Sequence, residues 1–314
     1  MRMGVLDVGS NTVHLLVVDA HRGAHPWPAH SEKVVLRLVE QIGPDGALTE
    51  AGADGLVEAV GRARAAATGL DAADLIAFAT SAVRDATNAA EVLARVRDAT
   101  GVRLEVLSGD DEARLTFLAV RRWFGWSAGR LLALDIGGGS LEIAAGIDEY
   151  PDVAISLPLG AGRLTRDRLR VDPDSAAPPS AEAVEELREY VDGLLDPVVR
   201  RMAEVGWERP VATSKTFRTL ARLAGAAPSG AGLWARRSLT RDGLRQVLGF
   251  VRHIPPRELS ALEGVGAGRS HQLLAGAVVA EAVLRRLDVP ALDICPWALR
   301  EGVILRRLDQ LSPM

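Results

Sequence analysis

The chain has 314 residues, of which 48% are hydrophobic and 25% charged, and a formal net charge of −4 at pH 7. This length is enough for two domains, and the weak acidic charge excludes a general electrostatic attraction to nucleic acid or to an anionic membrane. Any bound anion must therefore be held by local groups. The single cysteine, Cys295, excludes an internal disulfide framework. No apolar run reaches the roughly 18 residues of a membrane span, and the N-terminus lacks a cleavage-site pattern, so we expect a cytoplasmic protein.

The opening third of the sequence predicts strands alternating with helices. Two strands, Met3 to Val8 and Thr12 to Val18, are joined by the turn Gly9 to Asn11. Glycine and asparagine tolerate the positive φ that a tight hairpin requires, so this turn is typical of a β-hairpin. The elements expected next are a helix containing Leu56, Val57 and Val60, a strand at residues 75–79, a helix capped by Asn88 and ended by Gly101, and a strand at residues 103–107.

The following helix is predicted from its first turn and from its apolar stripe. Ser108 and Asp111 have the spacing of a capping box. Leu115, Leu118 and Ala119 then recur at helical spacing and supply a face for burial.

A domain boundary is predicted where the sequence FGWSAGR (residues 124–130) interrupts this pattern with two glycines. We assign residues 1–127 to a first domain and residues 128–314 to a second. The last helix of the second, at about 297–314, can pack back on the first domain.

The second half of the chain repeats the alternation of strands and helices, which indicates an α/β fold. A second strand pair begins at Leu131, and the polar loop at 172–180 ends in Ser180, a helix cap. The remaining predicted elements are helices at 181–194, 244–251 and 273–287, a strand at 291–295, and a helix opened by Pro296.

One short sequence motif occurs twice. DVGSNT (residues 7–12) falls on DIGGGS (residues 135–140) when the chain is shifted by 128 positions. Each copy places an aspartate, a glycine-bearing turn and a hydroxyl residue between two strands, which suggests a duplicated fold whose halves face each other across a cleft. A single such turn is equally typical of an ordinary hairpin. The duplication favours a second interpretation, in which bare backbone amides bind phosphate.

Seven segments carry a resemblance to a known family. They are GVLDVGSNTVHLLVVD, FATSAVRDATN, LSGDDEARLTFLAV, LALDIGGGSLEIAAG, SLPLGAGRLT, TSKTFRTLARL and PWALREGVILRRLD. In this order they resemble the exopolyphosphatase and guanosine pentaphosphate phosphatase family, a branch of the acetate kinase, sugar kinase, Hsp70 and actin superfamily. The resemblance implies two ribonuclease-H-like domains with the active site in the cleft, and a homodimer. It also implies removal of a terminal phosphate with Mg²⁺, or alternatively Mn²⁺.

Two acids on the second hairpin are candidate metal ligands. Asp135 and Glu142 lie on opposite strands across the glycine turn, and Mg²⁺ typically takes one or two carboxylates together with phosphate and water. Asp7 occupies the duplicate position, where it can reach a metal through water or serve as a structural aspartate. His14 stands where the second copy has Glu142, so only the second copy looks equipped for a metal.

The candidate general base, Glu112, is indicated by the resemblance alone. Asp110, Asp111 and Glu112 are all acids in the first turn of a helix, where the dipole favours negative charge without any catalytic role. If the resemblance holds, Glu112 orients and deprotonates the attacking water.

The candidate phosphate-binding groups are backbone amides and three cations. Among the 37 basic residues only Lys33 and Lys215 are lysine, and Lys215 stands between hydroxyl residues, where a compact charge could meet phosphate. Relatives often have a glycine-rich loop there, and its replacement disfavours nucleotide binding. The complete set is Gly9, Ser10, Asn11, Gly137, Gly138, Gly139, Ser140, Arg84, Arg163 and Lys215.

The leading hypothesis is therefore an exopolyphosphatase, which shortens inorganic polyphosphate by one phosphate at a time. Hydrolysis of guanosine pentaphosphate (pppGpp) would use the same groups and is the alternative substrate. A kinase of the same superfamily and a noncatalytic sensor of polyphosphate or nucleotide are further alternatives. Neither nucleic acid nor a membrane is an expected partner.

Overall fold

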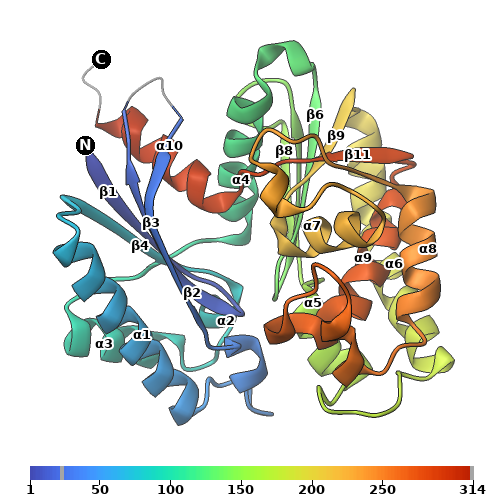
Figure 1. Cartoon of the computed structure of the whole chain (residues 1–314), viewed down its shortest axis with the longest axis horizontal. Coiled ribbons are helices and arrows are strands. Elements are labelled where there is room, and N and C mark those ends of the chain that lie inside the picture. Colours follow the sequence, from blue (N-terminus) through green and yellow to red (C-terminus); the bar gives the residue numbers. More distant parts are fainter. Residues whose placement is uncertain (22–24, 312–314) are drawn as a thin grey trace. The chain divides into compact units, whose positions relative to one another are not determined.

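The computed structural model describes residues 1–21 and 25–311, and the chain divides into two compact units. The first unit consists of Met1–Leu115 and the chain from Leu299 onwards, and the second of Thr116–Ala298. Each unit contains one β-sheet with helices on it, so the predicted two-domain α/β organisation is confirmed (Figure 1). The division falls inside helix α4 (Gly109–Phe124) rather than after it, and the limits at 127 and 128 stay a prediction.

The first unit is built on a five-stranded sheet in the order β3-β2-β1-β4-β5. β1 pairs antiparallel with β2 and parallel with β4, while β2 pairs antiparallel with β3. The elements of this unit are β1 (Arg2–Val8), β2 (Thr12–Asp19), β3 (Trp27–Val35), η1 (Leu38–Gln41), α1 (Glu50–Gly69), β4 (Asp74–Ala79), α2 (Ser81–Arg84), α3 (Ala89–Thr100), β5 (Glu105–Val106), the start of α4, and α10 (Leu299–Gln310).

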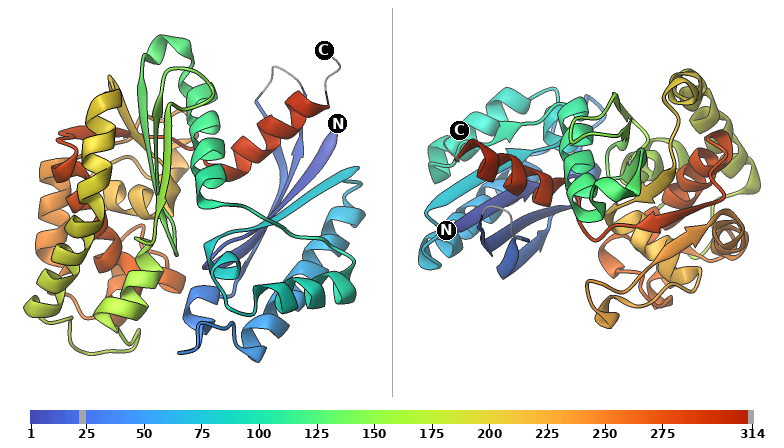
Figure 2. Two further views of the ribbon diagram at one scale, coloured as in Figure 1. Left: turned by 180° about the vertical axis from the view of Figure 1, so that it is seen from behind. Right: turned by 90° about the horizontal axis from the view of Figure 1, so that it is seen from above.

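Both faces of the first sheet are buried, and β1 illustrates how. Successive side chains of a strand point to opposite faces. Leu6 and Val8 join the apolar cluster that includes residues of α1 and α3. Met3 and Val5 join a second cluster with residues of α10, which lies along this sheet in Figure 2. The last helix of the chain therefore completes the core of the first unit.

The contact between α10 and α4 depends on a glycine. A Cβ atom at Gly302 would overlap the carbonyl group of Leu115. Only glycine lets the two helix backbones approach so closely. Within the first unit, α10 is thus held directly against the beginning of α4.

The second unit contains a six-stranded sheet in the order β10-β11-β9-β6-β7-β8. Its core gathers apolar side chains from β6 and β7 with those of the long helices α6 and α9. The elements of this unit are the end of α4, η2 (Trp126–Ala128), β6 (Leu131–Ile136), β7 (Leu141–Gly146), β8 (Val153–Leu157), α5 (Ala161–Leu164), η3 (Thr165–Leu169), α6 (Ala181–Val205), β9 (Arg209–Ala212), α7 (Ser214–Leu223), η4 (Ser229–Ala231), β10 (Ser238–Thr240), α8 (Arg241–Val251), η5 (Pro256–Ala261), η6 (Ala267–Gln272), α9 (Leu273–Arg286) and β11 (Ala291–Ile294).

Five strands of the second sheet repeat the topology of the first, with β10 added at the edge, which confirms the duplication inferred from the sequence. β3-β2-β1-β4-β5 of the first unit corresponds to β8-β7-β6-β9-β11 of the second, with antiparallel pairs followed by parallel ones. The registers of the hairpins also match. Asp7 lies opposite His14, and Asp135 lies opposite Glu142.

The hairpin turns differ from the prediction in their backbone conformation. Neither Gly9 nor Asn11 has a positive φ, and Gly137 does not either. The turns are open, because Gly9 N–H donates to the Thr12 carbonyl at 3.0 Å without a return bond from Thr12 among the described residues. A left-handed residue is needed in a closed two-residue turn and not here.

Three further local predictions were wrong. The strand expected at 103–107 is limited to β5, and α10 begins at Leu299 rather than at Pro296. The segment before α10 stays extended because Cys295 N–H donates to the Ala212 carbonyl at 2.8 Å. Asn88 precedes α3 but does not cap it, since its amide bonds both backbone groups of Leu48 at 2.9 Å. No helix in the described part of the chain combines the length and apolar character that a bilayer span requires.

Candidate active site

The turn between β6 and β7 leaves three backbone N–H groups unused. Gly137 N–H donates to the Ser140 carbonyl at 2.9 Å, which closes the end of the hairpin. The N–H groups of Gly138, Gly139 and Ser140 have no acceptor among the residues that the structure describes. Successive free amides in a turn form a concave site for an anion. This is the property that the glycine-rich sequence predicted.

The carbonyl groups of the three glycines in this turn accept hydrogen bonds from the segment at 161–163. Ala161 N–H donates to Gly137 at 3.0 Å, Arg163 N–H to Gly138 at 2.9 Å, and Arg163 Nε to Gly139 at 2.9 Å. These bonds orient the peptide groups, because a peptide whose carbonyl points to α5 points its N–H the other way. Arg163, a predicted phosphate ligand, thus contacts the turn itself.

Gly160 packs directly beneath this turn. A Cβ atom at Gly160 would overlap the backbone of Gly139 and Ser140. The glycine explains why the sequence PLGAG follows β8, since any side chain at this position would displace the turn.

The turn between β1 and β2 is braced in the same manner by a different segment. Val39 N–H donates to the Ser10 carbonyl at 3.0 Å, while Leu36 and Arg37 N–H donate to the Asn11 carbonyl at 3.1 and 3.0 Å. Ser10 N–H has no acceptor among the described residues. Its hydroxyl is engaged, because the Oγ atoms of Ser10 and Ser81 lie 3.0 Å apart in a buried hydrogen bond.

Asp135 and Glu142 form the acidic part of the second turn. Residues directly opposite each other in an antiparallel pair project from the same face of the sheet. Glu142 is buried, and Ser156 Oγ donates to its Oε1 at 2.9 Å. Two carboxylates beside free amides are a donor set that suits Mg²⁺ with a bound phosphate. No group of three or more potential metal ligands gathers within residues 1–21 and 25–311.

Asp7, the third predicted metal ligand, belongs to the first unit and has a different environment. In the sheet, Asp7 lies opposite His14 on β2, and His14 lies opposite Lys33 on β3. Burial raises the pKa of Asp7, while Arg300 at 3.9 Å and Lys33 act to lower it and Glu301 acts to raise it. His14 Nε2 is hydrogen-bonded to Ser31 Oγ at 2.8 Å. In the first copy the residue that faces the aspartate across the hairpin is therefore a histidine rather than a second acid.

Glu112 and Arg84, predicted from separate motifs, are in contact within the first unit. Glu112 is 6% exposed in the first turn of α4, and an Arg84 NH1 group donates to its Oε1. Arg84 also donates to the Leu107 carbonyl and to Asp85, each at 3.0 Å. Burial acts to lower the pKa of Arg84, but Glu112 and Asp85 outweigh it and raise the value. An adjacent guanidinium favours the ionised carboxylate, which is the form that can accept a proton.

Lys215 is exposed and lies at the start of α7 in the second unit. Its Nζ donates to the Gly264 carbonyl at 3.4 Å. The neighbouring Ser214 has a φ of 71°, a left-handed conformation that costs a non-glycine residue energy. Such strained residues cluster at functional sites. This conformation could not be predicted from the sequence, because the loop lacks glycine there.

Two arginines near α7 were also missed by the sequence analysis. Arg269 is half-buried, and its pKa is lowered by burial and by the neighbouring charge of Arg218. The Arg269 side chain has no hydrogen bond or ion pair among the described residues, although its backbone N–H donates to the Gly266 carbonyl at 3.1 Å. Two adjacent guanidiniums without an acid favour an anion as their partner. Only tertiary proximity reveals the pair, since 51 positions separate them in the sequence.

Comparison with known proteins places the chain among phosphatases. The model of the Ppx/GppA phosphatase family matches residues 17–311. Exopolyphosphatase 1 of Mycobacterium tuberculosis is 57% identical over 310 residues, which cover 98% of this chain and 89% of the relative. Exopolyphosphatase 2 of the same organism is 29% identical, with 97% of this chain and 98% of the relative covered.

Solved structures agree in fold over the whole chain. The crystal structure of an exopolyphosphatase from Cytophaga hutchinsonii matches with a TM-score of 0.88 and 26% identity, covering 99% of both chains. The structure of a PPX-GPPA enzyme from Aquifex aeolicus matches with a TM-score of 0.79 and 26% identity, covering 98% of this chain and 99% of the other.

Proposed function

Because the chain belongs to the Ppx/GppA phosphatase family, we propose that it is an exopolyphosphatase. Water attacks the terminal phosphorus of inorganic polyphosphate, the terminal P–O–P bridge breaks, and the products are free phosphate and a chain shorter by one unit. The observation that carries this proposal is the turn at 137–140, where three unused amides adjoin the pair Asp135 and Glu142. The 57% identity to a relative named Exopolyphosphatase 1 supports the choice of substrate.

Phosphoryl transfer needs mainly positioning and charge neutralisation from the protein. We assign the negative oxygens of the terminal phosphate to the N–H groups of Gly138, Gly139 and Ser140, and we assign Ser10 N–H a similar role in the first unit. Donors that are already oriented cost no reorganisation when charge develops in the transition state. The bonds from Ala161 and Arg163 to the turn supply this orientation.

Phosphatases of this family generally depend on a metal ion, and we assign its binding to Asp135 and Glu142. When bound, Mg²⁺, or Mn²⁺ as the alternative, would neutralise phosphate oxygens. Asp7 is the third candidate ligand from the sequence, and we assign it a supporting role, because Arg300 already lies 3.9 Å from its carboxylate.

Glu112 accepts the proton of the attacking water in this proposal. The Arg84 contact orients the carboxylate. We place Arg84 here as a positioning residue for Glu112, in addition to its predicted role with phosphate, and Lys215 as an outer contact for the polyanion. A homodimer and a cytoplasmic location remain predictions.

The experiment is a phosphate-release assay with purified protein, Mg²⁺, and either long-chain polyphosphate or pppGpp. We expect rapid release from polyphosphate. Strong release from pppGpp with none from polyphosphate would transfer the assignment to pppGpp hydrolysis. ADP formation that requires a sugar or acid acceptor would identify a kinase, and no turnover with any metal or chain length would leave a sensor.

The general base is tested by Glu112→Gln, with Asp110→Asn as the control on the same helical turn. Loss of a general base costs about 10²-fold or more in kcat, whereas the control should keep kcat within about twofold. Near-normal turnover of Glu112→Gln would remove the residue from this role.

A further inference from the structure

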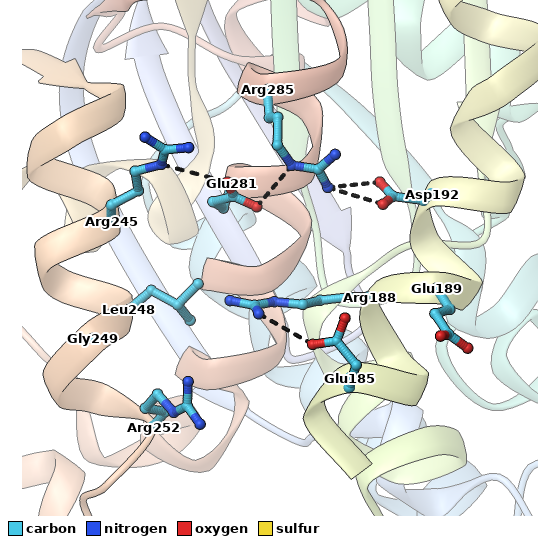
Figure 3. Close-up of a pocket in the computed structure, with 10 residues that line it drawn as sticks. All are labelled: Glu185, Arg188, Glu189, Asp192, Arg245, Leu248, Gly249, Arg252, Glu281 and Arg285. Atoms are coloured by element: carbon cyan, nitrogen blue, oxygen red, sulfur yellow. Dashed lines mark hydrogen bonds and ion pairs between the residues drawn. The ribbon is translucent and has the colours of Figure 1, made fainter. Parts of the chain in front are cut away.

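A charged pocket of about 580 Å³ lies in the second unit, and none of the residues assigned above lines it. Three helices form it, namely α6, α8 and α9, and Figure 3 shows the side chains that line it. The lining residues are Glu185, Arg188, Glu189 and Asp192 of α6, Arg245, Leu248, Gly249 and Arg252 of α8, and Glu281 and Arg285 of α9.

At one end of the pocket the charges are already paired. Two Arg285–Asp192 hydrogen bonds measure 2.9 Å each, and Arg285 Nε donates to Glu281 at 3.4 Å. Glu281 is 7% exposed and also lies 3.9 Å from Arg245. This network occupies the two most enclosed acids of the pocket with Arg285 and Arg245, so these acids do not neutralise the remaining arginines.

At the other end, Arg188 and Arg252 are poorly compensated. Arg188 reaches from α6 towards α8 in Figure 3, and its Nε is buried without a hydrogen-bond partner. Its ion pair with Glu185 measures 3.3 Å, but the Glu185 side chain is 62% exposed, and such exposed pairs contribute little. Arg252 is half-buried and has no ion pair among the residues that the structure describes.

Gly249 also lines the pocket, and the space next to it is open. A Cβ atom at this position would meet no atom within 4 Å. Leu248, which is buried, forms the neighbouring wall. The result is a recess with guanidinium groups from two different helices and one unsatisfied donor, which is the arrangement that binds a tetrahedral oxyanion.

We propose that this pocket binds a phosphate oxyanion between Arg188 and Arg252, as a second site separate from the turn at 137–140. The anion accepts hydrogen bonds from both guanidiniums, including the buried Arg188 Nε. The exposed carboxylates Glu185 and Glu189 at the rim turn to solvent when it binds. The oxyanion has two sources, free phosphate and an inner unit of a polyphosphate chain, and both present the same tetrahedral oxygens.

Protection from the arginine reagent phenylglyoxal tests the proposal at the level of single residues. Modification of each arginine is followed by peptide mass spectrometry, with inorganic phosphate, long-chain polyphosphate in EDTA, or chloride at equal ionic strength. Arg200 and Arg201 of α6 are exposed and do not line the pocket, so they serve as internal controls. An anion at ten times its dissociation constant should slow modification of Arg188 and Arg252 about tenfold, and should leave the controls unchanged.

Each result of this experiment decides something. Protection by free phosphate identifies the released product as the occupant, and protection by the chain alone identifies an inner unit of the polymer. Equal protection by chloride, or none by either phosphate source, overturns the proposal. The readout does not use turnover, so a failed Glu112 assignment leaves it untouched.

A steric variant provides a second test without a change of charge. Gly249→Leu should fill the recess and abolish the protection at Arg188 and Arg252. Gly193→Leu on α6 is the matched control, since a Cβ there also meets no atom within 4 Å and Gly193 is outside the pocket. Both variants are first checked for an unchanged circular dichroism spectrum and melting temperature. Protection that persists in folded Gly249→Leu contradicts the proposal.

Discussion

The two hairpin turns at 7–12 and 135–140 have similar backbone hydrogen bonds but differ in the side chains around them. In both, a glycine N–H donates to the carbonyl of the hydroxyl residue three positions later, and a later segment bonds the turn carbonyls. In the second copy the residue opposite the aspartate is Glu142, and in the first it is His14. The two turns therefore have the same backbone hydrogen bond, while a facing pair of acids accompanies only the second copy.

The variant with the largest expected effect on this difference is Glu142→Gln. We expect kcat to fall on the order of 10²-fold or more, because a catalytic metal supplies several kcal/mol of transition-state stabilisation. The matched change in the first copy, His14→Gln, alters the partner of Ser31 without removing an acid and should cost less than about tenfold in kcat. Steady-state kinetics at several Mg²⁺ concentrations measure both, and equal losses would mean that the two turns contribute alike.

The next prediction compares the stability cost of a methyl group beneath the second turn, in Gly160→Ala, with the cost of one within the first turn, in Gly9→Ala. The methyl group at Gly160 overlaps the backbone of Gly139 and Ser140, so overpacking should lower the free energy of unfolding by about 1–3 kcal/mol. At Gly9 the added Cβ would lie 3.4 Å from the Thr12 carbonyl oxygen, which is an ordinary contact. Urea unfolding should therefore show a smaller loss for Gly9→Ala, and a reversed order would contradict the packing argument.

Removal of the serine hydroxyl is predicted to have a different effect on protein stability in each of the two turns. Ser10→Ala removes the partner of the buried Ser81 hydroxyl and should cost about 1 kcal/mol of unfolding free energy. Ser140 Oγ has no hydrogen bond among the described residues, so Ser140→Ala should stay within about 0.5 kcal/mol. Replacing Ser10 and Ser81 together should recover part of the loss, which a double-mutant cycle measures.

The smallest expected effect concerns the contribution of Asp7 to the pH dependence of protein stability. Burial raises its pKa in the folded state, so its contribution to stability is present below its unfolded pKa and is lost as the pH rises through the folded value. Asp7→Asn removes this loss. The variant should melt above the wild type at neutral pH, with a difference that shrinks towards about pH 4. A difference that grows on acidification would show that the Arg300 contact outweighs burial.

The sequence predicted the fold and the position of the two hairpin turns because both follow from local patterns. Alternating strands and helices indicated the α/β class, and a repeated hexapeptide indicated the duplication. The contact of Arg84 with Glu112 escaped prediction because it joins separate elements, and so did the electrostatic influence of Arg218 on Arg269. Asn88 illustrates the same limit, since its position before a helix suggested a cap while tertiary structure used its amide on Leu48.

Helix α10, with Gly302 against Leu115, has a consequence for biosynthesis. The second unit is a continuous stretch of chain and can fold on the ribosome as soon as it emerges. The first unit begins earlier but must wait for α10, and until then Met3, Val5 and their apolar neighbours on that sheet face have no cover. The part of the protein that is translated first is thus the last to mature, and we expect it to be the part that needs chaperone protection in the nascent chain.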